Sequence, residues 1–123
     1  MPDHTIGMKR LGIIGGQGPE TSAMFCINVN RRFRELTDCQ ADIVLENMPI
    51  SKASERRIIM GGKDEDSLHL MKKATARLEE HVDFLVIPCN SAHVFLDRLR
   101  KRSKKPILSI IEETANVCQE KKF

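Results

Sequence analysis

The sequence predicts a single α/β domain over residues 1–123, with a four-stranded parallel sheet in the order 2-1-3-4 and helices on both faces. Short β-rich apolar runs alternate with longer segments of helical period, which is typical of βαβ units. The first apolar run ends in a glycine-rich turn, and 123 residues are enough for one domain but not for two. Right-handed crossovers between four parallel strands most simply give this order.

The elements follow one another without a repeat or a low-complexity tract. In chain order we expect a strand at 10–14, a helix from 19 to about 36, a strand at 42–46, a short helix at 54–60, a helix at about 64–81, a strand at 83–88, a helix to about 102, a strand at 107–111 and a helix from about 112. The connection over residues 47–63 is long, and connections of that length usually have a function.

The ends of the expected helices carry local signals. Pro19 can take the first helical position after the glycine turn, which the glycines make sterically possible. The helix that follows has an apolar stripe and a polar face rich in arginine. Asn90 and Ser91 are cap candidates for the helix that ends near residue 102, and the basic residues at its end suit the helix dipole.

The composition excludes several classes of function. The net charge is +3 with both signs interspersed, and there is no Trp or Tyr, so the basic patches and aromatic platforms of nucleic-acid binders are missing. No apolar run approaches the roughly 20 residues of a membrane span, and the first ten residues lack the apolar core of a signal peptide. We therefore expect a cytoplasmic protein that binds neither nucleic acid nor membranes. The four cysteines lack metal-ligand spacing, and each is expected to be a free thiol.

Strands one and three are neighbours in the expected sheet. The loops after them meet at its carboxyl edge, where open α/β sheets bind ligands, so the turn at 15–19 should lie beside Cys89, Asn90 and Ser91. Cys89 precedes a helix whose free N–H groups and positive dipole end favour a thiolate, and a thiolate is a base or a nucleophile. Asn90 and Ser91 add donors for a carboxylate. The alternative is a small buried cysteine followed by two capping residues.

The glycine turn does not match a nucleotide site. Gly16 and Gly18 begin a GxGxxG pattern, but its third position is Thr21, and the GK[ST] of a Walker loop is missing. The turn therefore indicates either the close approach of a small anion or a tight turn without a ligand.

Three more side chains have two interpretations each. His93 lies one helical turn beyond Cys89, where it either pairs with the thiol or packs at the helix start. Arg56 and Arg57 lie in the long connection, where either one could bind a second carboxylate with its planar fork, or both could be solvated.

Four segments carry a resemblance to a known family. They are LGIIGGQGP at the first strand, ENMP after the second, DFLVIPCNSAH at the third and SIIEETA at the fourth. In this order and spacing they resemble the aspartate/glutamate racemase family over nearly the whole chain. The resemblance implies the flavodoxin-like half of a two-domain, cofactor-independent amino-acid racemase. In such an enzyme two cysteines face opposite sides of the substrate Cα, one removing the α-proton and the other delivering a proton.

The same resemblance implies a role for particular residues. It makes Cys89 one catalytic acid/base and Arg56 the arginine that recognises the side-chain acid, with Arg57 as the alternative. The substrate-binding residues that it implies are Gln17, Gly18, Asn47, Arg56, Asn90 and Ser91.

The chain also departs from that family, whose members are roughly twice as long. It lacks the second half with its GCTE-like cysteine motif, and Cys118, the only cysteine after Cys89, lies mid-helix without that motif. We therefore expect the N-terminal half of an aspartate or glutamate racemase, truncated or naturally short, which cannot complete a two-base inversion alone. Its uncovered sheet edge and pocket wall predict a homo-oligomer such as a dimer. The alternative is a non-catalytic module that binds a dicarboxylate or a partner chain.

Overall fold

The computed structural model describes residues 8–122 and contains the predicted sheet. β1 (Leu11–Gly15) lies in the centre with every residue buried. β2 (Ile43–Asn47) and β3 (Phe84–Val86) pair with it on either side, and β4 (Ile107–Leu108) pairs with the outer side of β3. All pairings are parallel, so the predicted order 2-1-3-4 is confirmed.

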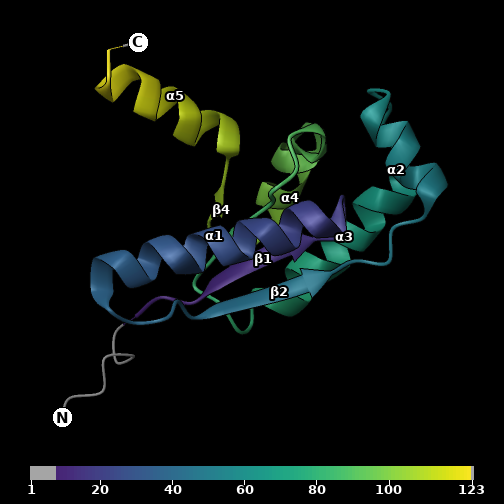
Figure 1. Ribbon diagram of the computed structural model, residues 1–123. Coiled ribbons are helices and arrows are strands. Elements are labelled where there is room, and N and C mark those ends of the chain that lie inside the picture. Colours follow the sequence, from purple (N-terminus) through teal and green to yellow (C-terminus); the bar gives the residue numbers. More distant parts are fainter. Residues whose placement is uncertain (1–7, 123) are drawn as a thin grey trace.

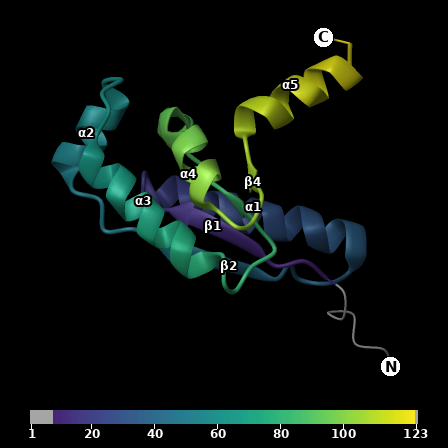
Figure 2. The same ribbon diagram turned by 180° about the vertical axis from the view of Figure 1, so that it is seen from behind.

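The helices cover the two faces of the sheet unequally. Of the described helices, α1 (Pro19–Thr37) covers one face, whereas α3 (Glu65–Leu78) and α4 (Leu96–Arg102) lie on the other (Figure 1; Figure 2). The larger apolar core lies on the side of α3 and α4, where Met71, Leu85 and Leu99 are among its buried residues. Burial of such aliphatic side chains is the main favourable contribution to folding. The cluster under α1 is much smaller.

Two helices lie outside this layered arrangement. α2 (Lys52–Ile59) packs against α3 and against η1 (Ser91–Phe95), a 3-10 turn that precedes α4. α5 (Ile110–Glu120) extends away from the sheet after β4, and none of its residues is buried (Figure 1). Within residues 8–122, no helix combines the length and the apolar character that crossing a membrane requires.

β4 is shorter than the strand predicted at 107–111, and the assignment of Ile110 and Ile111 to that strand is wrong. Ser109 has an extended backbone, and its side chain accepts a hydrogen bond from the Glu112 N–H at 3.1 Å, so α5 begins at Ile110. The Ser-x-x-Glu spacing is a helix-start signal, and it outweighs the β preference of the isoleucines. β3 is likewise shorter than the strand predicted at 83–88.

Of the two cap candidates, Asn90 and Ser91, Asn90 takes the N-cap position of η1 but does not cap it with its side chain. Asn90 has α-helical dihedral angles (φ −61°, ψ −47°), and its side chain makes no capping hydrogen bond. A capping side chain needs an extended backbone at its own residue. Ser91 begins η1 as its first residue, so Cys89 precedes a 3-10 turn and not the N-terminus of an α-helix.

The turn after β1 approaches the loop after β2 very closely at Gly16. Gly16 has φ +111°, and a Cβ atom built on it would lie 2.5 Å from the backbone oxygen of Met48 and 2.7 Å from its nitrogen. The Met48 N–H also donates to the Gly15 carbonyl at 2.9 Å, which holds the two loops together. A side chain at residue 16 would therefore have to displace backbone.

We predict that Gly16→Ala lowers the free energy of unfolding by about 2–4 kcal/mol, because it adds a backbone clash to an unfavourable φ. Gly61→Ala is the matched control, since Gly61 also has positive φ (+83°) but has nothing within 4 Å of the added Cβ. We expect the control to cost only about 1 kcal/mol, the price of the dihedral angle. Urea denaturation of the three proteins measures both changes, and equal losses would contradict the close approach.

Candidate active site

A cavity of about 290 Å³ opens at the carboxyl edge of the sheet, beside the ends of β1 and β3. We call it the Cys89 cavity. Its lining residues come from the glycine turn, the start of α1, one face of α2 and the loop after β3; they are Gln17, Gly18, Thr21, Glu55, Ile58, Ile59, Pro88, Cys89 and Asn90. The position agrees with the general location of ligand sites in open α/β sheets.

Cys89 lies at the boundary between the core and this cavity. It is partly buried, it packs against the larger apolar core, and it follows the buried Pro88. The side chain therefore lines a cavity while its backbone is held by the end of the sheet. All four cysteines of the chain are free thiols in the structure.

His93 forms hydrogen bonds with the main chain at Cys89 and at Ile110, and not with the Cys89 thiol. Its Nε2 accepts a hydrogen bond from the Ile110 N–H at 3.1 Å, so the ring proton is on Nδ1, which donates to the Cys89 carbonyl at 2.8 Å. Both ring nitrogens are thereby occupied, and the pairing of His93 with the Cys89 thiol does not form. The buried imidazole instead fixes the loop after β3 against the start of α5.

Gln17 supplies an amide whose oxygen has no partner. The side chain is 8% exposed, and its Nε2 donates to the sulfur of Met71 at 3.3 Å, whereas Oε1 is buried and makes no hydrogen bond to any described residue. A buried acceptor without a donor is costly, so such groups often lie at ligand sites. Gly18 beside it has φ +80° and forms the N-cap position of α1.

The structure brings four of the seven predicted site residues to one cavity. Gln17, Gly18, Cys89 and Asn90 all line it. The remaining three are exposed and do not line the cavity in this structure; they are Asn47, Arg56 and Ser91. Their roles stay predictions.

Asn47 and Arg56 are kept from the cavity by the elements that carry them. Asn47 is the last residue of β2 and pairs in register with Gly15, on the opposite side of β1 from β3. Arg56 follows Glu55 by one residue, so it projects about 100° around α2 from the face that lines the cavity.

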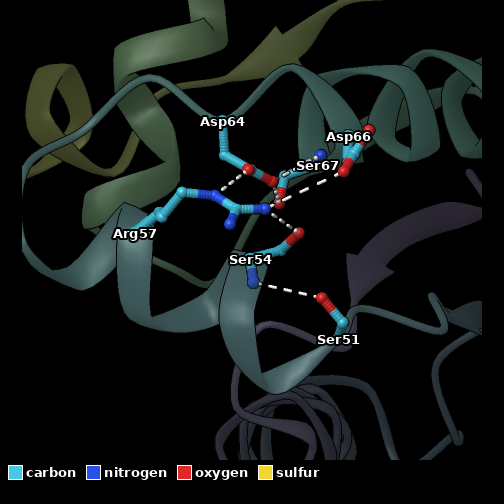
Figure 3. Close-up of polar contacts among 6 residues, drawn as sticks. All are labelled: Ser51, Ser54, Arg57, Asp64, Asp66 and Ser67. Carbon is cyan, nitrogen blue, oxygen red and sulfur yellow. Dashed lines mark hydrogen bonds and ion pairs between the residues drawn. The ribbon is translucent and has the colours of Figure 1, made fainter.

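Arg57, the alternative to Arg56, is held by the start of α3 (Figure 3). Its Nε donates to Oδ1 of Asp64 at 2.5 Å, and its Nη2 donates to the Ser54 hydroxyl at 3.3 Å. Asp64 also accepts hydrogen bonds from the backbone and hydroxyl of Ser67, at 2.9 and 2.7 Å, as the N-cap of α3. We call this group the α2–α3 clamp. It ties α2, and with it one wall of the Cys89 cavity, to the rest of the fold.

The clamp holds Asp64 in its ionised form. The side chain is only 3% exposed, yet the hydrogen bonds from Ser67 above all, together with those from Ser54 and Arg57, outweigh the cost of burial and hold the pKa of the carboxyl well below its usual range. In the unfolded chain Asp64 would titrate near the ordinary value of about 3.9.

We predict that Asp64→Asn lowers the free energy of unfolding by about 1–3 kcal/mol at pH 7, because asparagine still caps α3 but loses the charged contacts to Arg57. Since the folded-state pKa is lowered, wild type should lose this advantage as the pH falls below about 4, where the unfolded chain takes up a proton first. Urea denaturation at pH 7, 5, 4 and 3 measures the difference. Asp66→Asn, 84% exposed and 3.8 Å from Arg57, is the control and should cost little. A wild-type advantage that does not change with pH would contradict the role of the clamp.

Several lining residues, chiefly Glu55, Ile58 and Ile59, are not among the site residues predicted from the sequence. They share one face of α2 because they are spaced i, i+3 and i+4. A signal was present: the Ser51 hydroxyl accepts from the Ser54 N–H at 3.1 Å, so a serine cap marks the helix start at residue 52. Within residues 8–122, no three His, Cys, Asp or Glu side chains come together in a way that could bind a metal ion.

Comparison with known proteins identifies the family. The family described as Asp/Glu/Hydantoin racemase matches residues 14–122. The broad specificity amino-acid racemase RacX of Bacillus subtilis (strain 168) is 32% identical over 109 residues, which cover 85% of this chain and 47% of that protein. The chain therefore belongs to the Asp/Glu/Hydantoin racemase family.

Solved structures agree with this fold. A putative Asp/Glu racemase from Yersinia pestis superposes with a TM-score of 0.82 at 22% identity, covering 93% of this chain and 50% of that one. An aspartate racemase from Picrophilus torridus gives 0.71 at 25% identity, with 92% and 48% covered. The chain thus spans about half the length of the relatives that it matches.

Proposed function

We propose that this chain supplies one half of a cofactor-independent amino-acid racemase site, with Cys89 as one of its two acid/base groups. The observation that carries the proposal is that Cys89 lines a cavity together with Gln17 and Gly18 of the glycine turn. This places a thiol next to backbone and amide groups at the edge of the sheet, in a chain that belongs to a racemase family. We place the activity in the cytoplasm.

The chemistry follows from what each group can do. A Cys89 thiolate takes the proton of the substrate Cα, so the Cα–H bond breaks, an S–H bond forms, and the electron pair is left on Cα and delocalised into the carboxylate. Donors near that carboxylate stabilise the developing charge. The Asn90 amide supports this role, since it lines the cavity and its side chain makes no hydrogen bond to another described residue. The other three predicted residues do not line the cavity; they are Asn47, Arg56 and Ser91. They would contact a substrate only if it extended beyond the cavity or if their segments moved.

The central test is exchange of the α-proton in deuterated water. We predict that Cys89→Ala lowers the exchange rate at least 100-fold, the usual range for loss of a general acid or base. Cys39→Ala is the control, because Cys39 lies beyond the end of α1 and does not line the cavity. Proton NMR of each enantiomer of the amino acids follows the reaction. Undiminished exchange in the Cys89 variant would refute the assignment.

A two-base inversion needs a second proton donor on the other side of the substrate, and the Cys89 cavity does not supply one. We also propose that the chain forms a homo-oligomer through α5. Support comes from α5, where Ile111 and Val117 are 59% and 49% exposed. A second hollow of about 470 Å³ runs along this helix, and Asn90 borders both it and the Cys89 cavity. Cys118 lines that second hollow and not the first. Exposed apolar side chains beside a hollow are typical of interaction surfaces.

We predict that Val117→Asp weakens self-association at least tenfold, because it places a charge in the apolar surface of α5. Leu36→Asp is the control, since Leu36 is 67% exposed at the end of α1, away from this surface. Sedimentation equilibrium over a concentration series measures the dissociation constant. A wild-type chain that stays monomeric at high concentration would contradict the proposal.

The second candidate function is binding without turnover. The same cavity favours it, because the Cys89 thiol could line a binding site without taking part in proton transfer. Calorimetric titration with amino acids beside the exchange assay separates the two functions: binding without exchange would select the non-catalytic module.

A further inference from the structure

The charges around the Cys89 cavity differ from those expected of a site for dicarboxylates. Of its nine lining residues, Glu55 is the only carboxylic acid, and the Cys89 thiol is the only other acidic group. No arginine or lysine lines the cavity. A carboxylate at the end of an aspartate or glutamate side chain would therefore meet a like charge there.

Glu55 is also free to bind a ligand. It is partly buried, and its side chain makes no ion pair or hydrogen bond with any residue in 8–122. No cation of α2 forms an ion pair with it: Arg57 binds Asp64 and the Ser54 hydroxyl, Arg56 projects from another side of the helix, and Lys52, one turn earlier, is exposed and makes no ion pair with Glu55. A carboxylate that is partly removed from water and lacks a cation gains most from a cationic ligand.

The rest of the same wall fits the stem of a long side chain. Ile58 and Ile59 stand beside Glu55 on one face of α2, so the wall presents apolar surface next to a carboxylate. Lysine, ornithine and arginine carry a methylene chain with a cationic end, and such chains lie along apolar surface while the charge takes a polar partner. We propose that Glu55 makes this site select amino acids with a cationic side chain, an inference that rests on the function proposed above.

The experiment compares α-proton exchange for five amino acids in the full chain: lysine, ornithine, arginine, aspartate and glutamate. We expect kcat/KM for the cationic set to exceed that for the acidic pair by roughly tenfold or more, because a favourable charge contact replaces an unfavourable one. Glu55→Gln should remove most of this preference, because it should lower kcat/KM for the cationic amino acids much more than for the uncharged norleucine. Glu55→Lys should reverse the preference. Glu113→Gln, on the exposed side of α5, should change nothing.

Three outcomes would overturn the inference. Equal loss for lysine and norleucine in Glu55→Gln would mean that Glu55 binds the common α-ammonium group. A wild-type preference for aspartate and glutamate that disappears in Arg56→Ala would assign the recognition to Arg56. A preference for lysine that survives Glu55→Gln would place its cause elsewhere.

The failure of the proposed function gives a different pattern. If the folded chain exchanges the α-proton of no amino acid, the racemase proposal fails. Calorimetric titration then still tests whether Glu55 favours a cationic side chain. Lysine should then bind roughly tenfold more tightly than glutamate, and Glu55→Gln should abolish the difference. Equal affinities for lysine and glutamate in the wild type would overturn the inference about Glu55.

Discussion

The fold depends on the parallel pairing of β1 with both β2 and β3. Because β1 is buried along its whole length and ends at Gly15, its glycine turn emerges beside the loop that carries Cys89. Two segments more than 70 residues apart in the sequence thus meet because parallel strands share one carboxyl edge. The close backbone approach at Gly16 then holds the loop after β2 against the same turn. The cavity is a consequence of strand order and of one glycine.

The sequence was informative where local and global preferences agree. The strand order, the Pro19 helix start and the meeting of Gln17, Gly18 and Cys89 all follow from apolar runs, glycines and the right-handed crossover rule. The prediction from the sequence was wrong where two local signals, strand preference and helix capping, compete. Ile110 and Ile111 have strand-like side chains, but Ser109 caps a helix through them.

The walls of the site were harder to predict, because they depend on tertiary contacts. Whether Arg56 or Arg57 is free is decided by Asp64, which captures Arg57 at the N-cap of α3. The phase of α2 then turns Glu55 into the cavity. Neither fact is visible in the spacing of the arginines alone, and together they change the charge that a substrate would meet. Likewise, nothing in the spacing of His93 and Cys89 shows that the imidazole binds main chain.

The two hydrogen bonds of His93 couple the start of α5 to the loop that carries Cys89. One ring joins the carbonyl of Cys89 to the first N–H of a helix that otherwise stands clear of the sheet, and Arg100 reinforces that junction through the Ile107 carbonyl and Glu112. Any displacement of the base of α5 must therefore break the imidazole bridge or drag the cysteine's backbone along. A contact made by α5 would therefore be felt at the backbone that positions the Cys89 thiol.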